Sequence, residues 1–290
     1  MNPDVVQIRK LLEEWLSRRL TADSYGWIRD RQIAIGSGDK KSLFLAFGLA
    51  PRKVGKQDLS LSNDELTAAS NARCDWHPQG WSIDQATRTL FLLSLPTQES
   101  KELVATLDQL FGAGEVGELV ALYQALPLLP HAAAHVLRAA EGIRTNIKAV
   151  FCAVAHGNPY PSEQFTDDQW NQMILKCQFI GVSMTPVIGF DRRANLRLAE
   201  MVVDFIHERV AAKRPVAPGM WRCVGRFADA RVIADLERLL GSDVPSDRQA
   251  AALALSESPD PSARRILATE PELSGQVASG TITWMSIESN

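Results

Sequence analysis

Polar side chains that could bind a ligand are concentrated in the turn AHGNPYP, residues 155–161. His156, Asn158 and Tyr160 fall within five positions of one another, and each can donate or accept a hydrogen bond. The same residues also predict a helix end, because the glycine suits a left-handed C′ position and the prolines cannot continue a helix. The turn is therefore either a plain helix end or part of a small-molecule site.

A second candidate is the turn GFDRRAN, residues 189–195. Asp191 occupies the N-cap position of a predicted helix, and Arg192 and Arg193 follow in its first turn, where the helix dipole disfavours cations. Two guanidinium groups at this position require carboxylate partners or an anionic ligand, which they could bind through paired hydrogen bonds. A salt-bridge network and an anion site both remain open.

Three further polar residues on predicted helices are candidates. Asp204 and His207 are one helical step apart, so a carboxylate could orient the His207 imidazole, which could then act as a general base. Asn171 is next to the stripe that contains Trp170 and Cys177. It is either a groove residue or a core amide with satisfied hydrogen bonds.

Metal and cofactor chemistry has weaker support. Asp167 and Asp168 are spaced as in the aspartate-rich magnesium motif of terpene synthases, but they also suit the first turn of a helix and have no companion motif. His131 and His135 could clamp a transition metal from one helix face, yet no third ligand is near in sequence. Glycine-rich phosphate loops and GxSxG motifs are absent from the sequence. We predict no metal and no cofactor, and we favour a non-catalytic protein while leaving an enzyme open.

The elements that must position these residues are predicted to be helices. Apolar residues recur at steps of three and four from Val5 to Leu16. Capping-box patterns begin at Ser62, Ser82, Thr166 and Ser246. The segment 281–287 is the one clean strand-like alternation, and it is too short to make a sheet. We expect helices over residues 4–20, 22–34, 40–49, 63–73, 83–94, 98–111, 115–126, 131–156, 167–181, 192–213, 217–227, 229–241, 247–256 and 261–269.

The predicted fold class is all-α, an irregular α-α superhelix of stacked antiparallel helix pairs that becomes HEAT-like toward the C-terminus. We treat residues 1–290 as a single unit with an N-terminal helical part (1–125), a core (126–228) and HEAT-like C-terminal helices (229–290). The polar segment 51–62 lacks helical periodicity, and we expect a flexible loop there.

Composition limits the partners and the compartment. The chain has 31 Lys+Arg against 34 Asp+Glu, a formal net charge of -3, so no global positive field attracts nucleic acid. The N-terminus lacks the apolar run of a signal peptide or a membrane span. Four widely separated cysteines are typical of a reduced, cytoplasmic core. The apolar stripe of the first helix could still dock on a membrane or on a membrane partner.

The block 151–227 resembles the EboA family through the motifs AHGNPYP, WNQMILK, GFDRRAN, HERVAAKRPV and WRCVGRF. This resemblance implies a part in bacterial metabolite traffic, including movement of a secondary-metabolite precursor toward the periplasm. The ebo gene clusters also encode a prenyltransferase-like membrane protein, a TatD-like hydrolase, a sugar-phosphate-type TIM barrel and a dehydroquinate-synthase-like protein. The resemblance supplies no catalytic residues.

We therefore expect a cytoplasmic helical protein that takes part in secondary-metabolite handling by binding a small metabolite or another ebo-cluster protein. We expect the two turns of the best-matching block to border a common groove. The expected ligand-binding residues are His156, Asn158, Tyr160, Asn171, Asp191, Arg192, Arg193 and His207. One alternative is an enzyme of the same pathway with His156 or the Asp204–His207 pair as general base. Another is a purely structural scaffold that docks through its C-terminal third.

Overall fold

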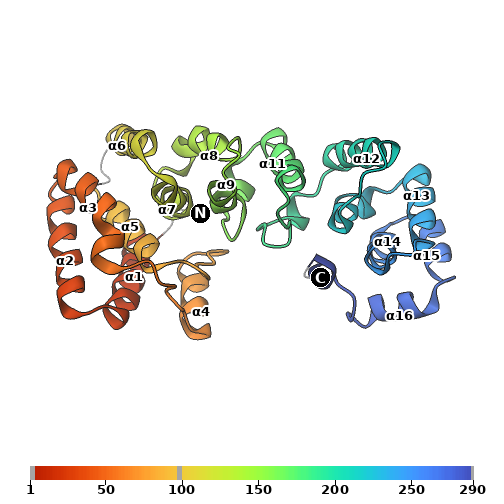
Figure 1. The fold of residues 1–290 in the computed structure, drawn as a ribbon, viewed down its shortest axis with the longest axis horizontal. Helices are drawn as coiled ribbons and strands as arrows, with labels where there is room; N and C mark the ends of the chain where they lie inside the picture. Colours follow the sequence, from red (N-terminus) through yellow and green to blue (C-terminus); the bar gives the residue numbers. More distant parts are fainter. Residues whose placement is uncertain (1–3, 97–99, 289–290) are drawn as a thin grey trace. The chain divides into compact units, whose positions relative to one another are not determined.

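The computed structural model describes residues 4–96 and 100–288. Within these two ranges the chain forms α-helices and short 3₁₀ helices and no strand, which confirms the all-α class (Figure 1). Every helix in these ranges is too short or too polar to serve as a membrane span. The chain divides into two compact units, unit 1 up to Gln169 and unit 2 from Trp170. The three-part division at residues 125 and 228 stays a prediction.

The helices of unit 1 follow one another through short connections. They are α1 (Val5–Arg19), α2 (Ala22–Gly36), α3 (Lys40–Val54), α4 (Asn63–Ala72), α5 (Ile83–Leu93), α6 (Ser100–Ala113), α7 (Val116–Ala125), η1 (Leu126–Leu128), η2 (Ala132–His135), α8 (Val136–Gly142), α9 (Lys148–Ala155) and α10 (Tyr160–Gln164). Unit 2 contains most of α11 (Asp167–Ile180), then η3 (Asp191–Arg193), α12 (Leu196–Ala211), η4 (Pro218–Cys223), η5 (Gly225–Phe227), α13 (Ala230–Leu240), α14 (Pro245–Glu257), α15 (Pro261–Leu267), α16 (Pro271–Ala278) and α17 (Trp284–Glu288).

The apolar stripe of α1 faces the core of unit 1. Ile8, Leu12, Trp15 and Leu16 are all buried, and the ring of Trp15 lies 5.6 Å from that of Trp76. Burial of such side chains removes apolar surface from water and stabilises the helix in place. The stripe is therefore not available for docking on a membrane, and this basis for peripheral contact was wrong.

The segment 51–62 is held by backbone hydrogen bonds, against the prediction of a flexible loop. Helix α3 continues through Pro51 to Val54. Beyond it, the Leu59 amide donates to the Trp81 carbonyl at 2.7 Å, and the Ile83 amide donates to the Gln57 carbonyl at 2.9 Å. Leu59 is also buried. Because its few apolar residues are widely spaced, its sequence carried no clear helical period.

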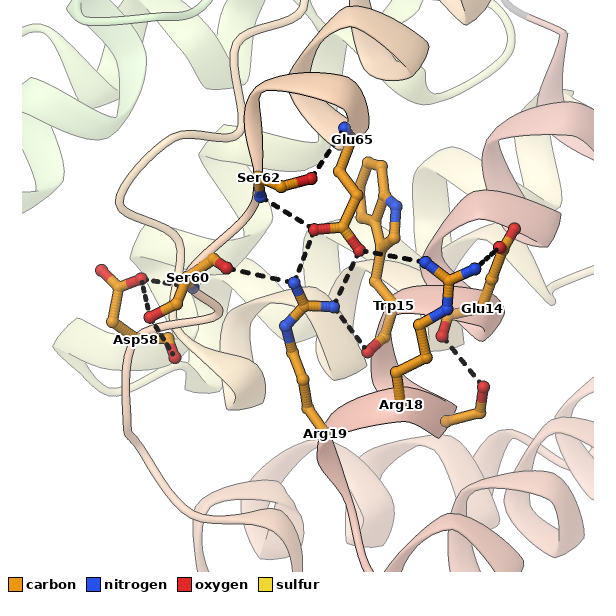
Figure 2. Close-up of polar contacts among 9 residues, drawn as sticks. Glu14, Trp15, Arg18, Arg19, Asp58, Ser60, Ser62 and Glu65 are labelled. Carbon is orange, nitrogen blue, oxygen red and sulfur yellow. Dashed lines mark hydrogen bonds and ion pairs between the residues drawn. The ribbon is translucent and has the colours of Figure 1, made fainter.

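A buried carboxylate joins the end of α1 to the start of α4 (Figure 2). Glu65 accepts from both terminal nitrogens of Arg19, at 3.0 and 2.6 Å, and lies 3.6 Å from Arg18. It also accepts from the Ser62 amide at 2.9 Å, which completes the predicted capping box. The hydrogen bonds from Arg19 hold the pKa of Glu65 below its usual range. This contact needs the ionised form of Glu65.

Several predicted helix boundaries were wrong. Asp191 does not cap a helix that starts at residue 192, because Asp191–Arg193 forms the separate 3₁₀ helix η3 and α12 begins at Leu196 with Asn195 as its N-cap. The expected helix 131–156 is broken into η2, α8 and α9, because His131 adopts a left-handed conformation and residues 143–147 form a connection. Ser246 does not cap α14, since that helix already begins at Pro245, a residue well suited to the first helical position. The segment 281–287 contains the start of helix α17 instead of a strand.

Helix α14 is the centre of unit 2 and contacts α13, α15, α16, α17 and η4. Its residues Ala250 to Leu255 are all buried, and the four alanines among them let neighbouring segments approach closely. At Gly225 a Cβ atom would lie 2.7 Å from the Ala254 carbonyl oxygen. The superhelical and HEAT-like character of this arrangement remains a prediction. Of the four cysteines, Cys177 and Cys223 are buried as expected, whereas Cys74 is exposed.

Candidate functional site

The AHGNPYP turn buries the side-chain amide of Asn158 inside unit 1. The Asn158 side chain is 4% exposed, and its Nδ2 donates to the carbonyl oxygens of Tyr123 at 3.0 Å and Ala153 at 2.9 Å. Its Oδ1 accepts from the Tyr160 amide at 3.0 Å. Both amide hydrogens are thus used by the backbone. Asn158 holds the turn in shape, and a ligand would have to replace these bonds.

Tyr160 is also engaged inside unit 1. Its ring is fully buried and its hydroxyl donates to the Ala132 carbonyl. Burial raises the pKa of the Tyr160 hydroxyl, so it remains a neutral donor. His156, at the end of α9, is half-buried and is the most accessible of the three predicted residues of this turn.

Asn171 is the core amide of a reciprocal pair in unit 2. Its Nδ2 donates to Asn195 Oδ1 at 3.2 Å, and Asn195 Nδ2 donates back to Asn171 Oδ1 at 2.9 Å. Asn195 Oδ1 also accepts from the Leu198 amide at 2.8 Å and so caps α12. Asn171 is 1% exposed. Its role here is to fix the position at which α12 begins.

The Asp191–Arg193 turn is built into a charged cluster within unit 2. Arg222 binds the Asp191 carboxylate with two nitrogens, at 3.3 and 2.9 Å, and Arg226 donates to the Asp191 carbonyl at 3.1 Å. The Arg193 guanidinium lies over the Trp170 ring, 5.1 Å from its centroid, in a cation–π contact. Arg192 is exposed. Asp191 therefore has structural partners in Arg222 and Arg226, and Arg193 has one in Trp170. The choice between a salt-bridge network and an anion site for the two arginines of the turn stays open.

His207 is held at both ring nitrogens by side chains of α13. Its Nε2 lies 2.6 Å from Asp235 Oδ2, and its Nδ1 lies 2.7 Å from Nη2 of Arg231. A guanidinium can only donate, so Nδ1 accepts and the proton on Nε2 is donated to Asp235. The carboxylate partner is thus Asp235, not Asp204 as the helical spacing suggested. No ring nitrogen is left over to take a proton from a substrate.

Two grooves lie along α12 and α13, one on each side of this bridge. The first, here called the Trp221 groove, has a volume of about 220 Å³. Its lining is Ile206, His207, Val210, Trp221, Asp235, Arg238, Leu239 and Ser242. The second, the Leu196 groove, has a volume of about 330 Å³, and its walls include Leu196, Glu200, Asp204, Phe227, Asp229 and Arg231. Val210 is 60% exposed at the rim of the Trp221 groove, so that rim is accessible.

The Trp221 groove is apolar along its length and polar at one end. Trp221, Ile206 and Leu239 supply the apolar wall. At the polar end the Asp235 carboxylate is bound by both His207 and Arg238. A mainly apolar lining with a few placed polar groups is typical of small-molecule sites. The volume suits a molecule of about one ring.

Of the predicted ligand residues, the structure places only His207 in this groove, among the residues it describes. His156, Asn158 and Tyr160 belong to unit 1, whereas Asn171, Asp191, Arg192 and Arg193 belong to unit 2. The common groove predicted for the two turns stays a prediction.

Sequence reasoning missed the residues of α13 that contact His207. Arg231, Asp235 and Arg238 are four and then three positions apart, which puts them on one face of the helix predicted over residues 229–241. That spacing was a usable signal. What it could not show is that this face meets α12.

The two metal patterns do not form sites. His135 is buried and its Nε2 donates to the Pro130 carbonyl at 3.0 Å. His131 precedes the helix η2 in a left-handed conformation, so the two histidines do not share one helix face. Asp167 and Asp168 lie in the first turn of α11, between Thr166 and Gln169, which form the predicted capping box. In the part of the chain that the structure describes, no group of three or more His, Cys, Asp or Glu side chains could hold a metal ion.

Comparison with known proteins identifies the family. The family model described as "Metabolite traffic protein EboA" matches residues 8–225 of the 290. The match covers unit 1 from α1 onward, and in unit 2 it covers α11, α12 and Trp221. It ends before α13, so one wall of the Trp221 groove lies outside it. Neither a curated protein nor a solved structure matches the chain. The resemblance found in the sequence is confirmed, and the chain belongs to the EboA family.

Proposed function

We propose that this protein takes part in metabolite traffic by binding a small, mainly apolar metabolite in the Trp221 groove. The observation that carries the proposal is the combination of an apolar wall, an exposed rim at Val210 and one polar end formed by His207, Asp235 and Arg238. We place the protein in the cytoplasm, where it would hold the metabolite for a partner from the same gene cluster. Binding without conversion is the proposed role.

The polar end favours particular ligand charges. Asp235 is already bound by His207 and by Arg238, and Arg238 is itself largely exposed. A cationic ligand would meet these donors, whereas a neutral or anionic end group could accept from Arg238. We therefore propose a ligand with an apolar ring or chain and a neutral or singly anionic end.

A catalytic role for His207 has less support. A general base needs a free ring nitrogen within hydrogen-bond reach of the proton that it takes. Both nitrogens of His207 are occupied, one by Asp235 and the other by Arg231. Turnover of a bound compound would nevertheless revive the enzyme alternative, and every binding experiment should be followed by analysis of the recovered compound.

Fluorine NMR on protein labelled with fluorotryptophan tests the site. The chain has seven tryptophans, so the Trp221 resonance can be assigned with a Trp221→Phe variant. The probes are phenylethanol, phenylacetate and phenethylamine, which share a ring and differ in end-group charge. We expect phenylethanol and phenylacetate to shift the Trp221 resonance in a saturable way, and phenethylamine to do so least.

The matched variants are Val210→Asp at the groove rim and Leu137→Asp at an exposed apolar position in unit 1. Val210 and Leu137 are 60% and 78% exposed, so neither substitution should unfold the chain. The saturable shift should be lost in Val210→Asp and kept in Leu137→Asp. Equal shifts in both variants, or shifts spread over tryptophans of both units, would remove the Trp221 groove as the binding site.

A further inference from the structure

A third groove lies in unit 1, between α1 and α2, and it differs in chemistry from the Trp221 groove. It has a volume of about 260 Å³. We call it the Arg9 groove, and its lining is Arg9, Glu13, Tyr25, Arg29, Gln32 and Ile33. Two guanidinium groups therefore face one carboxylate across a small space. Nothing in the proposed function uses this groove.

The hydrogen-bond donors of the Arg9 groove have few acceptors. Among the residues that the structure describes, Arg29 makes no ion pair and the Tyr25 hydroxyl makes no hydrogen bond. Arg9 approaches Glu13 no closer than 3.9 Å, and its Nε is buried with no partner in the described part of the chain. A guanidinium nitrogen that is removed from water without an acceptor is costly. An anion in the groove could accept from Arg29, from the Tyr25 hydroxyl and from the terminal nitrogens of Arg9, whose side chain is 39% exposed.

Glu13, the one carboxylate among the lining residues, is hydrogen-bonded to a residue of α2. Gln32 is buried, and its Nε2 donates to Glu13 Oε1 at 2.8 Å. Glu13 Oε1 is thus shared between this bond and the long 3.9 Å ion pair with Arg9. Burial and the nearby Glu13 raise the pKa of Tyr25, so its hydroxyl stays protonated and remains a donor.

We propose that the Arg9 groove binds the phosphate group of an organic phosphate monoester. Arg9 approaches from α1, and Arg29 and Tyr25 approach from α2, so donors reach the space from two sides. A tetrahedral phosphate offers three terminal oxygens to such a set, whereas a carboxylate offers two. Beside the groove, Ile33 is 70% exposed and can cover an apolar substituent of the ester.

The same phosphate chemistry occurs in a free metabolite and in a lipid headgroup. Titration calorimetry with phenyl phosphate tests the free ester, and benzoate is the carboxylate comparison. Flotation with phosphatidylcholine vesicles, with and without phosphatidic acid, tests the headgroup, since phosphatidic acid carries a phosphate monoester. Arg9→Gln and Arg29→Gln remove the proposed contacts. Arg144→Gln removes the same charge from an exposed position elsewhere in unit 1.

We expect Arg29→Gln to weaken binding of the responding probe by at least about tenfold, and Arg144→Gln to leave it unchanged. Benzoate should bind more weakly than phenyl phosphate. Glu13→Gln should tighten binding about threefold, because it removes the opposing negative charge. A gain of affinity cannot come from a damaged fold, and circular dichroism checks the fold of each variant.

The calorimetry and the flotation distinguish a free phosphate ester from a lipid headgroup. Phenyl phosphate binding without flotation assigns the groove to a free ester, and flotation that depends on phosphatidic acid and on Arg29 assigns it to a headgroup. Either result supports the phosphate site. The proposal is overturned if neither probe binds, if Arg9→Gln and Arg29→Gln bind as the unmodified chain does, or if Glu13→Gln weakens binding. These outcomes leave the Trp221 groove untouched, because that groove belongs to unit 2.

Discussion

The AHGNPYP turn and the Trp221 groove differ in where their polar side chains lie. In the turn, the side chains of Asn158 and Tyr160 donate hydrogen bonds to backbone carbonyls inside unit 1. In the groove, His207 and Asp235 contact each other at the edge of an accessible apolar space. Residue type and spacing alone therefore do not identify a binding site. What matters is whether the polar side chains lie in the interior or at the edge of a space that a ligand can enter.

The largest effect that this comparison predicts is on stability. Asn158→Ala removes three hydrogen bonds and leaves the buried Tyr123 carbonyl without this donor, so the free energy of unfolding should fall by about 3 kcal/mol. Urea denaturation followed by circular dichroism measures it. Asn146→Ala, at an exposed position, is the control and should change stability by less than about 0.5 kcal/mol. A stable Asn158→Ala protein that loses metabolite binding would make the turn a ligand site after all.

A somewhat smaller effect is expected at the α1–α4 contact. Glu65→Gln breaks charged hydrogen bonds to Arg19 and should lower the free energy of unfolding by about 2 kcal/mol at neutral pH. Because the folded pKa of Glu65 lies below its unfolded value of about 4.3, its contribution is complete above that value and is lost as pH falls through the lower folded pKa. The variant should therefore lose less stability than the unmodified chain on acidification. An unchanged acid profile would contradict this assignment.

The groove predicts an effect on binding without one on folding. Val210→Asp places a charge at the rim of the Trp221 groove and should weaken binding of phenylacetate by at least about tenfold, or about 1.4 kcal/mol. Its thermal midpoint should match that of Leu137→Asp. If Val210→Asp and Leu137→Asp lose stability to the same extent and bind phenylacetate equally, the groove is not a ligand site.

The smallest effect is expected at Glu257, which sharpens the contrast with Glu65. Burial raises the pKa of Glu257, which accepts from the Trp284 indole at 2.6 Å. Since the folded pKa lies above the unfolded value, its ionisation lowers stability as pH rises through the folded pKa. Glu257→Gln keeps an acceptor for Trp284 and removes the charge. It should leave the free energy of unfolding at neutral pH unchanged or raise it by less than about 1 kcal/mol, and a clear loss in urea denaturation would contradict this.

Much of the fold could be predicted from the sequence because helix signals are local. The capping boxes at Ser62 and Thr166 and the apolar stripe of α1 each depend on residues within a few positions. The break between α8 and α9 could not be predicted in this way. Gly142, at the end of α8, lies so close to Tyr123 that a Cβ atom would be 2.7 Å from its ring, and this packing is tertiary.

The candidate site was predictable only in part for the same reason. His207 stood out as a titratable residue on an amphipathic helix, and its helical neighbour Asp204 was the natural partner by spacing. Its actual partner, Asp235, is 28 positions away. Likewise Asn171 was recognised as either a groove residue or a core amide, but the choice depended on Asn195, which is 24 positions away. Pairings at such distances become visible only in the folded chain.

The most direct test of metabolite binding is native mass spectrometry of the protein expressed with its neighbouring genes and purified gently. The unmodified chain and Val210→Asp should be compared, and denaturation should follow to release and identify any bound compound. We expect the unmodified chain to carry a small-molecule mass that is absent from Val210→Asp. A bare chain in both preparations, or a compound retained equally by both, would contradict binding in the Trp221 groove.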